Sequence, residues 1–253
     1  MTSLVDAPTG RHLAQFHRDV ESLTESAFVF LEAGLRGGNS VLVVAPTDRV
    51  ERLFDRLAAS RFHPKSLSDS GQLAVLDETA IVRHVVNGGT PEWMGVRAML
   101  GPMLSRLRTY GSGTRIYAEI ANALWESGNT DAAIALEDFW NALAQSYQFA
   151  LYCGYCMDTH SDQCYAAPLE ELGRTHSDIL GTPDDERLGV ALDRASKEIF
   201  GISLTQMAGV SRQDAARRFP SGQRTMLWVK RNLPMSTPQL VERARYYFKD
   251  NHP

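Results

Sequence analysis

The sequence has few of the features that mark exported or membrane proteins. Its 253 residues include three cysteines, an odd number confined to residues 153–164, which does not fit an extracellular disulfide framework. The longest apolar run beside a strand pattern covers residues 41–45, whereas a membrane span requires roughly 20 residues. The first ten residues lack a basic segment followed by an apolar one, so no secretory signal is expected. We therefore expect a cytoplasmic protein that makes no membrane contact.

Excess charge is also scarce, but it is unevenly distributed. The chain carries 26 Lys+Arg and 30 Asp+Glu, for a net charge of −4. Division at Pro183 gives a net charge of −8 for residues 1–183 and +4 for residues 184–253. A basic C-terminal segment permits contact with nucleic acid or with an acidic partner, although a solvated helical surface has the same composition.

Alternating strand and helix patterns over the first 165 residues predict a parallel sheet covered by helices. The run VLVVA at residues 41–45 is apolar throughout, as expected of a strand buried on both faces. Residues 169–180 and the segment after residue 184 have helical patterns. We therefore predict an α/β, three-layer domain followed by a small all-α C-terminal module. The expected strands are residues 12–17, 41–45, 73–76, 115–118 and 149–153.

Five phrases recur in the order and spacing of a known family: HLAQFHRD, GLRGGNSVLVVAP, RIYAEIANALWESGN, ALEDFWNALAQ and FALYCGY. Together they resemble the MEDS domain, a sensory domain of methanogen and methylotroph signalling proteins and of the dichloromethane regulator DcmR. The resemblance covers residues 11–180 and leaves residues 184–253 as an output module. It implies a small-molecule sensor, proposed for hydrocarbon derivatives, with a RecA-like fold related to that of the KaiC-type ATPases.

The residues themselves argue against nucleotide hydrolysis on such a scaffold. A phosphate loop needs glycines and a lysine between the first strand and the first helix. Residues 17–22 read HRDVES, with neither residue type and with two carboxylates that repel phosphate. Gly37 and Gly38 precede the next strand, where we expect them to end a helix. Because no Ser/His/Asp set is recognisable either, we expect a protein without enzymatic activity.

Ligands of open α/β sheets bind at the carboxyl ends of the strands. Glu119 follows the strand at 115–118 and either selects a polar group of the effector or stabilises the start of the next helix. Glu137 and Trp140 lie one helical turn apart, which fits core packing as well as an aromatic wall for an effector. The candidate residues for binding a small-molecule effector are Phe16, His17, Asp77, Glu119, Trp125, Glu137, Trp140, Cys153 and Tyr155.

A second candidate site has the spacing C-x2-C-x3-H-x3-C. Three thiolates and one imidazole could hold zinc or another soft metal, and no other cofactor is predicted. The alternatives are a redox pair in CGYC, or cysteines that only pack in the core. His176 could complete the site or lie at the domain edge. The four candidate metal ligands are Cys153, Cys156, His160 and Cys164.

The C-terminal segment contains LTQMAGVSRQDAARRF, which is similar to a helix-turn-helix. Its second helix could contact bases and phosphates in a major groove through Arg212, Gln213, Arg217 and Arg218. The alternative is a helical module that forms a homodimer or docks on a signalling partner. We therefore favour a small-molecule sensor with a helical output module. A DNA-binding regulator and a metal- or redox-responsive protein remain as alternative hypotheses.

Overall fold

The computed structural model describes residues 3–87, 89–165, 168–205 and 218–250. The chain forms two compact units that are interleaved along the sequence, whereas the predicted domains at 11–180 and 184–253 are each continuous. Unit 1 comprises Met1–Ala14, Asp19–Cys156 and Thr175–Asp178. Unit 2 comprises Gln15–Arg18, Met157–Arg174 and Ile179–Pro253.

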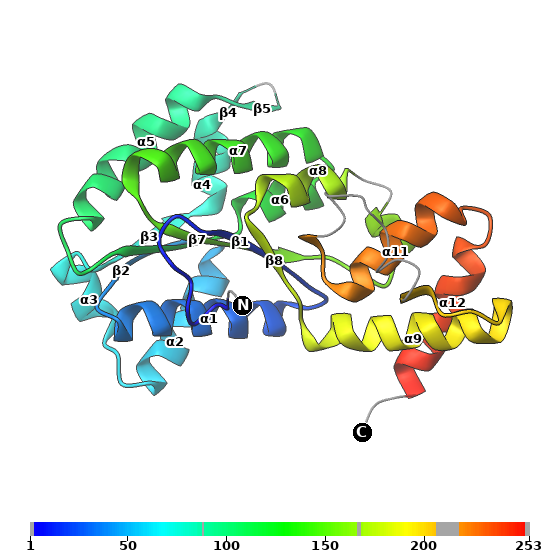
Figure 1. Cartoon of the computed structure of the whole chain (residues 1–253). Helices are drawn as coiled ribbons and strands as arrows, with labels where there is room; N and C mark the ends of the chain where they lie inside the picture. Colours follow the sequence, from blue (N-terminus) through cyan, green and yellow to red (C-terminus); the bar gives the residue numbers. More distant parts are fainter. Residues whose placement is uncertain (1–2, 88, 166–167, 206–217, 251–253) are drawn as a thin grey trace. The chain divides into compact units, whose positions relative to one another are not determined.

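A six-stranded parallel sheet with the order β3-β2-β6-β7-β1-β8 organises the fold (Figure 1). The five predicted strands are confirmed, each to within three residues at either end. All six residues of β2 are buried, as its apolar sequence predicts. The strands are β1 (His12–His17), β2 (Ser40–Ala45), β3 (Leu73–Asp77), β6 (Thr114–Ala118), β7 (Ala150–Cys156) and β8 (Asp178–Leu180).

Helices of unit 1 cover both faces of this sheet (Figure 1). Helices α1 (Val20–Arg36) and α2 (Thr47–Ala59) pack together on one face. The other face carries α4 (Glu78–Val85), α5 (Trp93–Leu107), α6 (Ile120–Glu126) and α7 (Thr130–Tyr147). The short helix α3 (Pro64–Ser70) leads into β3, and β4 (Val86–Asn87) pairs with β5 (Thr90–Pro91). The helices that follow the neighbouring strands β2 and β6 therefore leave on opposite faces, which makes this pair a topological switch point.

The ends of helix α1 agree with the sequence analysis. Its first turn is capped by the Asp19 carboxylate, which accepts a hydrogen bond from the backbone N–H of Ser22 at 2.8 Å. A carboxylate therefore occupies the helix N-terminus where a phosphate loop would hold phosphate. At the other end Gly37 caps the helix, and Gly38 follows with a positive φ of 74°, a conformation that favours glycine.

Unit 2 is mainly helical in the described residues. Its longest helix, α9 (Pro183–Phe200), packs against α11 (Ser221–Asn232) and α12 (Thr237–Asp250). The buried Asp185 carboxylate accepts hydrogen bonds from the N–H groups of Gly222 and Gln223, and so caps α11 from a neighbouring helix. None of the helices in the described ranges has the length and apolarity needed to cross a bilayer.

The predicted helix at 169–180 is wrong in its second half. Helix α8 (Leu169–Thr175) ends five residues early, and Asp178–Leu180 form β8 at the edge of the sheet. A strand of three residues is too short to show a period of two, so only its pairing with β1 defines it. The segment at 204–219, which is similar to a helix-turn-helix, falls mostly on residues 206–217, outside the described part of the chain.

Candidate functional site

The switch point between β2 and β6 gathers polar side chains, and we refer to Arg49, Asp77, Glu78 and Glu119 as the strand-end site. Ala45 of β2 lies opposite Asp77 at the end of β3. The backbone N–H of Glu119, just after β6, donates to the carbonyl oxygen of Val44 at 2.9 Å. Three strand ends therefore meet where ligands of open α/β sheets bind.

A buried ion pair forms the centre of the strand-end site. Arg49 Nε donates to Glu119 Oε1 at 2.9 Å, and these side chains are 7% and 1% exposed. The Tyr117 hydroxyl also donates to Glu119 Oε1, at 2.6 Å. Burial alone would lower the pKa of Arg49, but the Glu119 carboxylate raises it above its ordinary value. Burial raises the pKa of Glu119, although the bonds from Tyr117 and Arg49 oppose this change.

Glu78 adds a buried carboxyl group with unused hydrogen-bonding capacity. The residue is 9% exposed, and its Oε2 has no hydrogen-bond partner within the described ranges. Burial, reinforced by repulsion from Glu119, raises the pKa of Glu78 to about 8. Glu78 is therefore largely protonated at neutral pH and can donate a hydrogen bond. Asp77 differs because it is exposed, caps α4 through Ala80 N–H and has a lowered pKa.

The raised pKa of Glu78 predicts that the protein loses stability as pH rises. Between the ordinary value of 4.5 and about 8, the unfolded chain ionises Glu78 while the folded chain keeps the proton. The free energy of unfolding therefore falls over this window, by at most about 1.4 kcal/mol per pH unit for one group. Glu78→Gln should remove this loss. Urea unfolding from pH 5 to pH 8 should therefore show the free energy of unfolding of the variant rising relative to that of the native chain. Equal pH profiles for both proteins, or the same gain for the exposed control Glu51→Gln on α2, would contradict this assignment.

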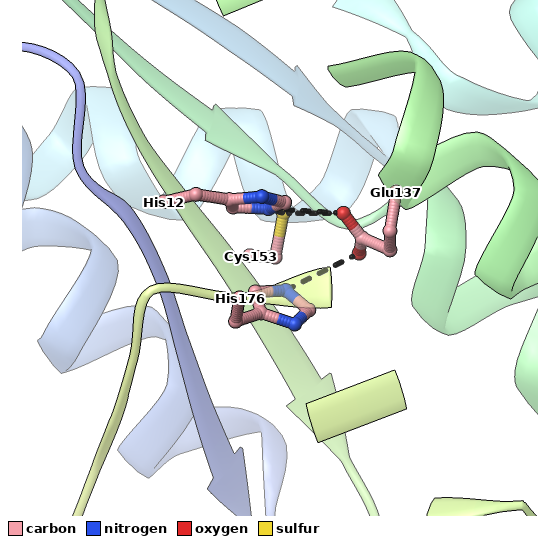
Figure 2. Close-up of side chains that lie close together, drawn as sticks. All are labelled: His12, Glu137, Cys153 and His176. Carbon is pink, nitrogen blue, oxygen red and sulfur yellow. Dashed lines mark hydrogen bonds and ion pairs between the residues drawn. The ribbon is translucent and has the colours of Figure 1, made fainter. Parts of the chain in front are cut away.

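A second group of polar side chains lies in the core of unit 1, and we name it the histidine–cysteine cluster (Figure 2). It consists of His12 at the start of β1, Glu137 on α7, Cys153 on β7 and His176 after α8. All four residues are buried, and Glu137 is 0% exposed. One donor atom from each residue lies within 4.8 Å of the others.

Glu137 is the centre of the histidine–cysteine cluster. Its Oε2 lies 3.0 Å from His12 Nε2 and 3.4 Å from Cys153 Sγ, and its Oε1 lies 3.6 Å from His176 Nε2. The Tyr155 hydroxyl donates to Oε1. Burial alone would raise the pKa of Glu137, but the two imidazoles outweigh burial and lower it. The carboxylate is thus ionised inside the core.

Burial acts against the charged forms of two other cluster residues, His12 and Cys153. Burial, together with the nearby His176, lowers the pKa of His12. Burial and the Glu137 carboxylate raise the pKa of the Cys153 thiol well above its ordinary value. The cluster therefore places an anionic carboxylate beside two imidazoles and a thiol, groups that can provide metal ligands.

The structure separates the predicted effector residues. Asp77 and Glu119 meet at the strand-end site, whereas Glu137 and Cys153 meet in the histidine–cysteine cluster, where the Tyr155 hydroxyl donates to Glu137. The remaining four lie elsewhere. Phe16 and His17 belong to unit 2, where Phe16 stacks on Phe219 with ring centroids 6.2 Å apart. Trp140 packs edge to face on Phe149, and Trp125 is half-buried on α6.

The predicted C-x2-C-x3-H-x3-C ligands do not form a group of three or more donors in the part of the chain that the structure describes. Cys153 and Cys156 lie three residues apart on β7, so their side chains project from opposite faces of the strand. Cys153 instead joins His12, Glu137 and His176. His160 and Cys164 lie in unit 2, where Cys164 Sγ is 3.5 Å from Met157 Sδ.

The proposed DNA-contacting residues fall largely outside the described ranges. Arg212, Gln213 and Arg217 lie in the undescribed interval, while Arg218 is exposed and donates to the carbonyl oxygen of Arg174 at 3.0 Å. DNA binding therefore stays a prediction. Its test is a duplex affinity that falls steeply with salt and is weakened by Arg217→Ala and Arg218→Ala.

Sequence reasoning missed Arg49, Tyr117 and Glu78 at the strand-end site, and His12 in the cluster. The strand patterns did contain part of the signal. Tyr117 lies two residues before Glu119 on the same strand face, and Glu78 directly follows Asp77. His12 gave no local signal, because only the adjacency of β1 and β7 brings it to Cys153.

An open parallel sheet with helices on both faces, and with a carboxylate where a phosphate loop would lie, defines a three-layer α/β domain. The family model for the MEDS domain, described as methanogen/methylotroph, DcmR sensory domain, matches residues 11–177. The chain therefore belongs to the MEDS family, which confirms the resemblance found in the sequence. No curated protein matches the chain.

Proposed function

We propose that this is a non-enzymatic sensory protein that binds a small organic cation at the strand-end site and signals through the helices of residues 184–253. The observation that carries the proposal is the buried Glu78 carboxyl, with its unpaired Oε2, beside the Arg49–Glu119 ion pair in the described part of the chain. Convergent polar groups with perturbed pKa values at a switch point are typical of ligand sites. The sensory assignment of the family supports the same interpretation.

The surplus of carboxyl groups favours a cation as the effector. Glu119, Asp77 and Glu126 all contribute to the raised pKa of Glu78, and the positive charge of Arg49 opposes this shift. A substituted ammonium ion would donate an N–H to Glu78 Oε2 and offset the repulsion among the carboxylates. A methylated amine, which is a small hydrocarbon derivative, fits the methylotroph element in the family's description.

Calorimetric titration of the full chain with methylammonium tests the binding step. Because the cation replaces the Glu78 proton, affinity should rise with pH, by up to about tenfold per unit below pH 8. Glu78→Gln should abolish this dependence, and Glu32→Gln on α1 should leave it intact. Failure of methylammonium to bind, or equal binding of methanol, would contradict the proposal.

Hydrogen exchange of the full chain tests the signalling step. Methylammonium should change exchange rates in residues 184–205 or 218–250, because an effector shifts a conformational equilibrium only if it prefers one state. The Glu78→Gln chain should show no change under the same addition. A response confined to unit 1 would mean that the site binds without signalling to these helices.

A further inference from the structure

We propose that the histidine–cysteine cluster is a binding site for one divalent ion of the zinc class. The site is separate from the strand-end site, and the proposal does not depend on the effector. Its ligands would be His12, Glu137, Cys153 and His176, one donor atom each. Two imidazoles, a thiolate and a carboxylate are a donor set that zinc accepts in proteins.

The distances within the cluster agree with tetrahedral coordination. Zinc bonds of about 2.0–2.3 Å at tetrahedral angles place the ligand atoms about 3.3–3.6 Å from one another. The three distances among His12 Nε2, Glu137 Oε2 and Cys153 Sγ are 3.0, 3.4 and 3.4 Å. His176 Nε2 lies 3.6 Å from the other oxygen of Glu137 (Figure 2). Three donors are thus already arranged around a common point, and the fourth lies beside it.

Hydrogen bonds outside the cluster direct the Nε2 atom of His12 toward this point. Asn141 Nδ2 donates to the carbonyl oxygen of Thr175 at 2.8 Å, so its Oδ1 faces His12 Nδ1 at 2.9 Å. His12 Nδ1 must therefore carry a proton, which leaves the Nε2 lone pair of the neutral ring facing Glu137 Oε2. Two lone pairs at 3.0 Å require a proton or a metal ion between them.

Two other contacts outside the four proposed ligands also orient ligand atoms toward this point. His176 Nδ1 lies 3.1 Å from the Thr175 hydroxyl, so the Nε2 edge of this ring is also turned to the cluster. The Tyr155 hydroxyl donates a hydrogen bond to Glu137 Oε1, so that Oε2 faces His12 and Cys153. Metal-binding histidines and carboxylates in proteins are held by partners of this kind.

The charges balance when an ion is bound. Binding breaks the S–H bond of Cys153, displaces the proton between His12 Nε2 and Glu137 Oε2 and releases both protons to solvent, while the metal ion forms bonds to sulfur, nitrogen and oxygen. The thiolate and the Glu137 carboxylate then offset the two positive charges of the ion, and both imidazoles bind it as neutral ligands. A centre of zero net charge suits a site in which Glu137 and His176 side chains are 0% exposed, because burying net charge is costly.

Cobalt substitution tests the site in the full chain. Chelator-treated protein is titrated with Co²⁺, and zinc content is measured separately by mass spectrometry after zinc loading. We expect one ion per chain, the visible bands of tetrahedral cobalt and a thiolate-to-cobalt charge-transfer band. Cys153→Ser should abolish the charge-transfer band, and Asn141→Ala should weaken binding by about 10–100-fold. Matched controls are Cys156→Ser, Cys164→Ser and His84→Ala, which should bind as the native chain does.

Two outcomes would overturn the proposal. One is the absence of saturable Co²⁺ binding by the native chain. The other is a charge-transfer band that survives Cys153→Ser and disappears in Cys156→Ser or Cys164→Ser. Should Cys153→Ser fail to fold, proton release by the native chain decides the question: two protons per ion support thiol ligation, and one proton or none overturns it.

Discussion

Glu137→Ala is expected to lower the free energy of unfolding by about 3–5 kcal/mol in the presence of a chelator. The Glu137 side chain is 0% exposed and accepts a hydrogen bond from the Tyr155 hydroxyl, while His12 Nε2 lies 3.0 Å away. Alanine leaves these buried groups without their acceptor and with no access to water. The loss is a large part of the roughly 5–15 kcal/mol that stabilises a typical protein.

Two further variants make this result specific to the buried carboxylate. Asp138→Ala removes an exposed carboxylate from the next position of α7 and should change the free energy of unfolding by less than about 0.5 kcal/mol. Glu137→Gln keeps the side-chain volume and an oxygen that accepts from Tyr155, so its loss should lie between the two. Urea unfolding measures all three. If Glu137→Ala lost no more than Asp138→Ala, the carboxylate would not be the centre of the cluster.

Glu119→Ala is the second substitution with a large expected effect, again about 3–5 kcal/mol. Arg49 is 6% exposed, and without Glu119 its guanidinium would be a buried charge that donates to two neutral acceptors, the Val20 carbonyl oxygen and the Thr24 hydroxyl. Arg49→Met should also lower the free energy of unfolding, because it leaves the buried Glu119 carboxylate without its cation. Chemical unfolding of both single variants at pH 7 measures these losses.

The double variant Arg49→Met, Glu119→Leu should recover much of the stability that either single change removes. Apolar residues of similar volume avoid the desolvation of both charges, and replacing a buried pair in this way is often neutral or stabilising. The double-mutant cycle then gives a coupling energy of the same order as the single losses. The exposed pair Arg36–Glu32 is the control, and Arg36→Ala should cost about 0.3–0.5 kcal/mol. Additive losses at Arg49 and Glu119 would show that the two charges do not depend on each other.

The sheet could be predicted from the sequence because short strand patterns alternate with helical patterns along the chain, and because β2 is an almost continuous apolar run. The edge strand Asp178–Leu180 could not, because three residues carry no period and their pairing partner lies more than 160 positions earlier in the chain. The same local patterns predicted the end of α1 at the glycine pair, where backbone conformation depends on the residue type itself.

The strand-end site was predictable to the extent that it depends on strand ends. Glu119 and Asp77 were found because each closes a strand. Arg49 and Glu78 lie in the first turns of helices, and their approach to Glu119 follows from the order β3-β2-β6, which no local pattern encodes. Sequence reasoning therefore located the edge of the sheet and two of its side chains, but not the ion pair.

The predicted metal ligands depend on where strand β7 ends. A strand that ends at Cys153, as the sequence pattern predicts, leaves Cys156 in a turn where both thiols could face one ion. The strand continues to Cys156, and alternation puts Cys153 and Tyr155 on one face and Cys156 on the other. The three additional residues of the strand therefore account for the separation of the two cysteines, because alternation along the longer strand puts them on opposite faces.

The interleaving of the two units has a consequence for how this protein could exchange parts with others. Strand β1 starts in unit 1 and ends in unit 2, and Met157–Arg174 belong to unit 2 although they lie within the family match. End-to-end fusion of genes joins continuous segments. A hybrid in which residues 184–253 are replaced would therefore receive only part of a new unit 2, and would keep Gln15–Arg18 and Met157–Arg174 from the original protein. Residues 11–177 and residues 184–253 of this chain are thus expected to be inherited together, with compatible changes in both.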